Sequence, residues 1–197
     1  MALNRSMLSS DSTLWGTPRD FYEWLAEQFA FTIDVCALPT NKKHRRFFSP
    51  ADNGLAQSWE GETAWCNPPY GRGIGNWLDK GRDEAMHARA LAVFLVPARP
   101  DTDWWNNFVM SHDGRAGRLL RSSYHVESRV LWLRWEALIT GVYFHDERVA
   151  FEGMDSEDDA APFPSAIIIH AHPSRRPPAQ RPQLEEGQRL LTLGWPR

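Results

Sequence analysis

Residues 63–69 constrain this chain most, because an apolar run there leads directly into two consecutive prolines. Neither proline can donate a ladder hydrogen bond, so the strand predicted for Thr63–Cys66 has to end at Asn67. Each proline also pushes the residue before it toward extended backbone. The sequence therefore predicts a stiff loop at the carboxyl end of a strand, which is where open α/β sheets bind their ligands.

The side chains of this loop suit the recognition of an exocyclic amino group. Asn67 offers a side-chain carbonyl, and the main-chain carbonyl of Pro68 is free to accept a hydrogen bond. Two acceptors are what an amino group with two N–H bonds requires. Tyr70 adds a flat face on which a base can stack. A proline-rich turn that is capped by an asparagine is the alternative interpretation.

The composition is that of an ordinary globular protein. The chain has 197 residues, 42% of them hydrophobic, and a formal net charge of −3, so any DNA contact has to come from local patches. Cys36 and Cys66 form neither a metal-ligand nor a disulfide pattern, so we expect a reduced cytoplasmic protein without a metal. No apolar run approaches membrane-spanning length, so we expect no membrane partner.

Hydrophobic periodicity predicts the elements around the loop. A helix is expected to begin with Thr17 as its cap and Pro18 at its first position, and a second helix is expected over residues 76–88. A third helix is expected to begin at Asp101. Strands that are buried on both faces are expected over residues 31–35, 91–96 and 166–169.

Two further predictions concern the second half of the chain. Residues 130–138 are expected to form a helix, because Leu131, Trp135 and Leu138 recur at helical spacing. Residues 142–144 and 148–151 are expected to pair as a hairpin.

Charged residues near the loop give candidate binding positions. Asp34 ends the strand predicted over residues 31–35, and a carboxylate there suits the ammonium or ribose hydroxyls of a cofactor. Capping of the next turn is the alternative role for Asp34. The densest basic run, residues 42–46, precedes two phenylalanines, a combination that suits phosphate contact and stacking. A solvated loop is the alternative for this run.

The segment Asn67-Pro68-Pro69-Tyr70 resembles the catalytic motif of amino-group methyltransferases that use S-adenosylmethionine. The chain is more similar still to the phage-type DNA N-6-adenine methyltransferase (Dam-like) family. Asp34-Val35-Cys36-Ala37 resembles the cofactor segment of that family, and residues 97–102 resemble its Pro-Ala-Arg and Asp-Thr segment. The resemblance covers residues 13–170, with a looser match at 52–55. Unlike the broader methyltransferase pattern, the chain has no glycine-rich loop after Asp34.

This resemblance implies methyl transfer from S-adenosylmethionine to the N-6 amino group of adenine in double-stranded DNA, without a metal. The residues assigned to catalysis are Asn67, Pro68, Pro69 and Tyr70. The residues assigned to the cofactor are Trp15, Thr17, Pro18, Asp34, Cys36, Ala37 and Asp52. The residues assigned to DNA are Lys42, Lys43, Arg45, Arg46 and Arg99.

The spacing of the motifs limits the fold. Only 33 positions separate Asp34 from Asn67, which is too few for the helices and strands that a full methyltransferase sheet places there. We therefore expect a trimmed Rossmann-like S-adenosylmethionine-dependent methyltransferase fold in one α/β domain, residues 13–170. A flexible N-terminus (1–12) and a disordered Pro/Arg-rich tail (171–197) are expected on either side.

Three alternatives remain open for the function. Protein-glutamine methyltransferases share Asn-Pro-Pro-Tyr, although they lack the Trp-Gly-Thr-Pro start and the Asp-Val-Cys-Ala segment. Adenine in RNA is a second possible substrate, and a DNA-binding relative without activity is the third. For the DNA enzyme, the expected setting is the cytoplasm of a bacterium or a phage-infected host, in restriction-modification or in regulation.

Overall fold

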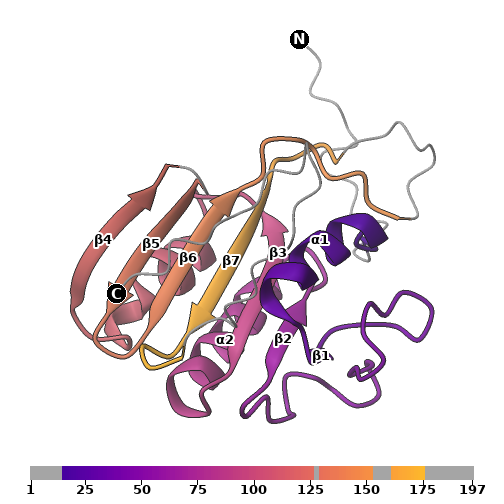
Figure 1. Cartoon of the computed structure of the whole chain (residues 1–197), viewed down its shortest axis with the longest axis horizontal. Coiled ribbons are helices and arrows are strands. Elements are labelled where there is room, and N and C mark those ends of the chain that lie inside the picture. Colours follow the sequence, from indigo (N-terminus) through magenta and orange to yellow (C-terminus); the bar gives the residue numbers. More distant parts are fainter. Residues whose placement is uncertain (1–14, 127–128, 153–160, 176–197) are drawn as a thin grey trace.

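The fold is built on a seven-stranded sheet, seen in a computed structural model that describes residues 15–126, 129–152 and 161–175. The strand order is β1-β2-β3-β7-β6-β5-β4 (Figure 1). The strands are β1 (Ile33–Asp34), β2 (Thr63–Cys66), β3 (Leu91–Pro97), β4 (Leu119–His125), β5 (Val130–Trp135), β6 (Ile139–Phe144) and β7 (Ser165–Ala171). The first three strands are parallel neighbours, and the other four pair in antiparallel fashion.

Helices cover both faces of this sheet. They are α1 (Arg19–Phe29), α2 (Ile74–His87) and α3 (Asp103–Trp105), with a π-helical turn at Asn106–Met110 and a 3-10 turn at His112–Gly114 after α3. On one face, Tyr22 of α1 meets Trp65 of β2, with ring centroids 5.6 Å apart. On the other face, α2 approaches Phe94 of β3 closely at Gly81, where no side chain intervenes.

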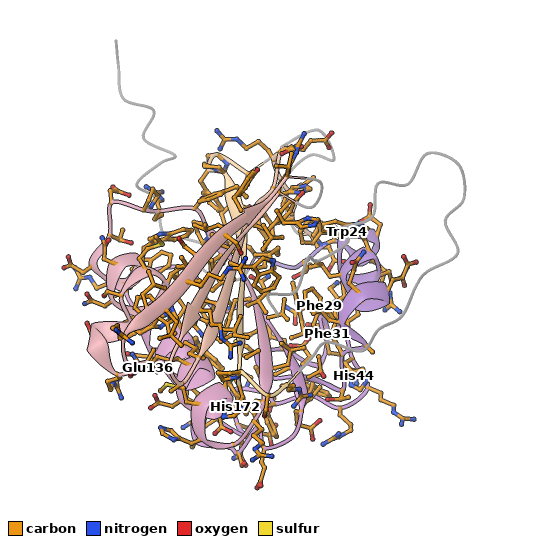
Figure 2. The ribbon with its side chains drawn as sticks, turned by 60° about the vertical axis from the view of Figure 1, so that its left-hand side comes forward. Trp24, Phe29, Phe31, His44, Glu136 and His172 are labelled. Carbon is orange, nitrogen blue, oxygen red and sulfur yellow. The ribbon has the colours of Figure 1, made fainter. Side chains whose placement is uncertain are left out.

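The core is centred on β3, because all seven residues of this strand are buried. Its apolar sequence fits a strand with helices on both faces. At the edge of the core, the rings of Phe29 and Phe31 stack with centroids 5.7 Å apart. Figure 2 shows this pair and Trp24 on one side of the molecule, away from Glu136 in the turn after β5.

Most of the predicted elements near the loop are confirmed. The strand at Thr63–Cys66 is present, and the strands predicted over residues 91–96 and 166–169 are present as the slightly longer β3 and β7. The strand predicted over 31–35 is reduced to two residues. The helix predicted over 76–88 begins two residues earlier, and the one expected from Asp101 begins at Asp103.

The start of α1 differs from the prediction. The helix begins at Arg19, and Pro18 takes the cap position without a side-chain cap. Thr17 is instead almost fully buried, and its hydroxyl accepts a hydrogen bond from Asn67 in the loop after β2. The Thr-Pro pair therefore marks the helix start, but the threonine hydroxyl is used elsewhere.

Two predictions for the second half of the chain are wrong. Residues 130–135 form strand β5, not a helix, because their apolar side chains are buried on both faces of the sheet between β4 and β6. Residues 142–144 end strand β6, which pairs with β5 and β7. Residues 148–151 therefore form no hairpin with them, although Val149 and Phe151 are buried.

The connection between β1 and β2 positions the candidate site. Residues 35–62 contain no helix, as the short spacing predicts, and touch the sheet through a bridge between Asp34 and Phe47. Within the described residues, the structure is therefore a mixed α/β fold with a shortened parallel part. No helix in these parts of the chain is both long and apolar enough to cross a membrane.

Candidate active site

A cavity opens at the carboxyl ends of β1 and β2, as the position of the proline loop predicts. It encloses about 790 Å³ of empty space, including the part that is open to solvent. Segments that are distant in sequence form its wall, among them residues 15–17, residues 34–38, the connection that follows them up to Gly54, and the loop after β2.

Asn67 is held in this wall with one end of its amide bonded and the other end unpaired. Its Nδ2 donates to the main-chain oxygen of Trp15 and to the hydroxyl of Thr17, the latter at 3.0 Å. Because a carbonyl can only accept, the nitrogen has to face Trp15, and this fixes the orientation of the amide. Oδ1 is buried and has no hydrogen-bond partner in the described structure. A buried acceptor of this kind needs an explanation, and a ligand donor supplies one.

The other residues of the loop lie in two places, the prolines in the cavity wall and Tyr70 in the core. Pro68 and Pro69 line the cavity. The Tyr70 ring is buried and packs edge-on against Phe151 and Phe163, with centroids 5.8 Å and 5.6 Å away. Burial raises the pKa of Tyr70 well above its ordinary value. The structure therefore does not bring Tyr70 to the cavity wall, and its role as a stacking platform stays a prediction.

Asp34 combines the two roles considered for it. Its side chain lines the cavity and is only 2% exposed. The carboxylate accepts hydrogen bonds from the backbone N–H of Cys36 at 3.3 Å and of Lys43 at 3.0 Å, so it caps the loop that follows β1. Burial nevertheless raises its pKa to about 6. The two backbone hydrogen bonds therefore do not fully offset the cost of burying the carboxylate. It lies in the cavity wall, where a hydrogen-bond donor of a ligand would reach it.

The other residues assigned to the cofactor are only partly brought together. Trp15, Thr17, Cys36 and Ala37 line the cavity. Pro18 caps α1 and does not line it. Asp52 is exposed and accepts hydrogen bonds from the backbone and hydroxyl of Ser49, so it closes its own turn.

Sequence reasoning missed several residues of the wall. They are Phe48, Pro50, Gly54 and Trp77. Gly54 lies in the segment 52–55, which loosely resembles the family. A Cβ added there would lie 2.1 Å from the carbonyl oxygen of Val35, so only glycine fits at this position. The sequence singles out Phe48 only for stacking beside the basic run, and Pro50 and Trp77 carry no local pattern, because tertiary packing places them in the wall.

Comparison with known proteins decides the family. The family model described as DNA N-6-adenine-methyltransferase (Dam) matches residues 5–114, which is more than half of the chain. The chain belongs to this family. A curated relative, the DNA N-6-adenine-methyltransferase of Haemophilus phage HP1 (strain HP1c1), is 30% identical over 102 residues. The match spans 51% of this chain and 58% of the relative.

The family match includes the cavity but not the whole sheet of this Dam-family chain. Asn67, Asp34 and the segment at residues 15–17 all lie inside the matched residues. Strands β4 to β7 lie beyond residue 114.

The fold places the residues of the basic run in different environments, some in ion pairs and some exposed. Lys43 has a side chain that is only 6% exposed, lies in the cavity wall and pairs with Glu152 at 2.6 Å. Arg46 makes a two-pronged contact with Glu62, at 2.7 Å and 3.2 Å. Lys42, whose ammonium lies over the ring of Phe47, and Arg45 are both exposed. Of the five residues assigned to DNA, these two and the exposed Arg99 beyond β3 are therefore available to a phosphate without loss of an internal ion pair.

Glu152 contacts two walls of the cavity, although no pattern in its own segment predicts a role in the site. Its backbone N–H donates to the carbonyl oxygen of Gly16 at 2.7 Å, while its carboxylate pairs with Lys43. Gly16 lies between Trp15 and Thr17, the two residues that hold Asn67. Glu152 therefore links Lys43, in the connection after β1, to the segment at residues 15–17. That segment in turn holds Asn67.

Proposed function

We propose that this protein transfers a methyl group from S-adenosylmethionine to the N-6 amino group of adenine in double-stranded DNA. The observation that supports this proposal most is the unpaired Oδ1 of Asn67, since its amide nitrogen is already used by Trp15 and Thr17. Membership of the Dam family supports the same reaction. The substrate DNA lies in the cytoplasm of a bacterium or a phage-infected host, where we expect the protein to act.

The residues around the cavity fit the proposed methyl donor. When bound, S-adenosylmethionine supplies an electrophilic methyl group on a sulfonium centre. Asp34 would accept hydrogen bonds from its ribose hydroxyls or its ammonium group, because the carboxylate is buried in the wall with a pKa of about 6. Phe48, Pro50 and Trp77 give the apolar surface that an adenine ring requires.

The chain's contribution to the chemistry is to orient and polarise the target amino group. An adenine amino nitrogen is a poor nucleophile, because its lone pair is delocalised into the ring. If Asn67 Oδ1 and the Pro68 carbonyl each accept one N–H, the nitrogen is held closer to a tetrahedral geometry. The same two oxygens stabilise the positive charge that develops as the new bond forms. The target base has to leave the duplex to reach them.

The test is a methyl-transfer assay with labelled S-adenosylmethionine and unmethylated duplex DNA, RNA or protein as substrate. We expect N-6-methyladenine in DNA, identified by mass spectrometry of the nucleosides. Label in protein glutamine or in RNA adenine would replace the proposal with one of the alternatives. Absence of transfer to any of these substrates would leave an inactive DNA-binding relative.

The role of Asn67 is tested by Asn67→Ala, with Asn76→Ala on the exposed side of α2 as the matched control. Loss of a preorganised acceptor costs roughly two orders of magnitude or more in kcat. Affinity for S-adenosylhomocysteine, measured by calorimetry, should hold in both variants. Turnover of Asn67→Ala close to that of the control would remove Asn67 from the mechanism.

A further inference from the structure

The β4–β5 hairpin and the residues that lead into it carry an excess of positive charge on this acidic protein. Residues 115–135 contain five arginines and one acidic residue, whereas the whole chain has a net charge of −3. This segment lies beyond the residues that match the family model. A local cationic surface on an acidic protein is the electrostatic footprint expected of contact with a polyanion.

The hairpin lies at the outer edge of the sheet. β4 is the last strand in the order, it pairs only with β5 among the described strands, and most of its residues are exposed (Figure 1). β5 pairs on its other side with β6, so the hairpin is the edge of the sheet, and β4 presents the exposed surface that a DNA backbone could contact.

Strand direction places the carboxyl end of β4, at His125, at the same edge of the sheet as the loop after β2, and Arg121 lies four residues before that end, roughly 14 Å along the strand. Four successive antiparallel pairings lead from β3 to β4, so β4 runs in the same direction as β2 and β3. Their arrowheads point the same way in Figure 1. Five strand spacings separate β2 from β4, which amounts to roughly 24 Å, or about seven base pairs of duplex.

Two arginines of the hairpin face each other across its strands. Arg121 of β4 and Arg134 of β5 are direct cross-strand partners on the same face of the sheet. Like charges in this arrangement destabilise a sheet. Neither guanidinium makes an ion pair with an acidic residue in the described parts of the chain. The other arginines of the segment do, since Arg115 pairs with Asp79 and Asp83, Arg118 with Glu136, and Arg129 with Asp146.

We propose that the β4–β5 hairpin is a DNA-docking surface, in which Arg121 and Arg134 together hold one backbone phosphate of the duplex. The inference rests on the proposed action on DNA and adds a contact that lies outside the cavity. A guanidinium binds phosphate with two parallel hydrogen bonds, and a shared phosphate turns the repulsion between the two cations into attraction. The base enters the cavity while the flanking duplex rests on the hairpin.

The experiment compares Arg121→Ala, Arg134→Ala and the double variant with wild type. Arg118→Ala is the matched control, because Arg118 lies on the same hairpin but is paired with Glu136. Binding isotherms on duplex DNA are measured at several salt concentrations. We expect affinity to fall about tenfold, equally for cognate and non-cognate DNA, and the salt slope to fall by about 0.9. The salt slope of the double variant should also fall by about 0.9, as in each single variant, because both arginines hold the same phosphate.

Two further readouts separate this proposal from a structural role and from the proposed function. The Tm of the DNA-free protein should stay constant or rise by roughly 1–2 °C in each single variant, because the cross-strand repulsion is relieved. In methyl transfer, KM for DNA should rise while kcat and the affinity for S-adenosylhomocysteine hold.

Three results would overturn the inference while wild type still methylates DNA. They are an unchanged salt slope, a slope change in the double variant that is the sum of the single changes, and a clear fall in Tm. Self-association of the wild type that both single variants abolish would also overturn it, since the free edge would then belong to a second copy. Absence of methylation by wild type would instead count against the proposed function.

Discussion

At the scale of single residues, the orientation of Asn67 depends on a partner 50 positions earlier in the chain. Thr17 accepts a hydrogen bond from the Asn67 amide and is almost fully buried. Thr17→Val keeps the shape of the side chain and removes the acceptor. We expect kcat to fall about three- to tenfold, as for the loss of one ordinary hydrogen bond, because the amide can then rotate. Affinity for S-adenosylhomocysteine should hold.

Thr17→Ser is the control for this prediction, because it restores the hydroxyl. Steady-state kinetics on duplex DNA is the measurement. Equal losses in the valine and serine variants would show that Thr17 acts by packing rather than by holding Asn67.

Asp34 makes a second residue-scale prediction, which concerns pH. Its pKa is raised by burial from the ordinary value of 3.8 to about 6 in the folded protein. Between these values the folded state binds a proton that the unfolded chain releases, so this group's contribution to stability is present at low pH and is lost as pH rises through 6. Relative to Asp34→Asn, the free energy of unfolding of wild type should therefore fall between about pH 4 and pH 7, by at most about 1.4 kcal/mol per pH unit.

Urea titrations of both proteins across this pH range provide the measurement. In the same range, affinity of wild type for S-adenosylhomocysteine should rise with pH, because the ionised carboxylate is the better acceptor for a ligand donor. A constant difference between the two proteins would mean that Asp34 titrates at its ordinary pKa.

The contrast between Asn67 and Thr17 shows what the sequence could and could not predict at this scale. The place of Asn67 followed from the chemistry of the two prolines after it, which is a local constraint. Thr17 was expected to cap a helix, because a Thr-Pro pair is a local helix-start pattern. Its contact with Asn67 joins segments that only the folded chain brings together, so no local pattern could reveal it.

At the scale of elements, the packing of α2 on β3 depends on Gly81. A Cβ at this position would lie 2.3 Å from Cζ of Phe94 and 3.2 Å from Cβ of Ala92. Gly81→Ala should therefore destabilise the protein by about 1–3 kcal/mol of overpacking, reduced by up to about 1 kcal/mol through better helix propensity.

Gly73→Ala is the matched control for this substitution, because nothing lies within 4 Å of a Cβ there and its backbone is helical. We expect its free energy of unfolding to stay within about 0.5 kcal/mol of wild type. Chemical denaturation of both variants is the measurement. A Gly81→Ala variant as stable as the control would mean that α2 shifts away from β3 without cost.

Burial on both faces of the sheet explains why a helix is wrongly predicted where β5 lies. Leu131, Trp135 and Leu138 fit a helical stripe, but Val130 and Trp132 are equally buried on the other face of the sheet. A short run that is apolar on both faces carries no decisive period, so its neighbours decide its structure. By contrast, the strand before the prolines and the buried run at residues 91–96 were predictable, because they combine an apolar run with clear boundaries.

At the scale of the whole molecule, charge is distributed differently from what the basic run suggests. Lys43 and Arg46 are used internally, in ion pairs with Glu152 and Glu62. Lys43 is buried in the cavity wall, whereas Arg46 is about half exposed and is held by Glu62 outside the residues that line the cavity. Because the net charge is −3, the positive charge that could meet DNA is confined to separate exposed positions. The fold determines which cations these are.

This distribution predicts that two halves of one basic run behave differently in DNA binding. Lys42→Ala with Arg45→Ala removes two exposed cations beside the cavity, so affinity for cognate and non-cognate duplexes should fall alike, and the salt slope should become shallower by up to about 0.9 for each phosphate lost. Lys43→Ala with Arg46→Ala should leave the slope unchanged and lower Tm, because it leaves Glu152 and the partly buried Glu62 without their partners. Isotherms at several salt concentrations, together with thermal unfolding, compare the two double variants directly. A shallower slope in the second variant would show that its ion pairs open to receive DNA, and an unchanged slope in the first would leave Arg99 and the β4–β5 hairpin as the surfaces that meet the duplex.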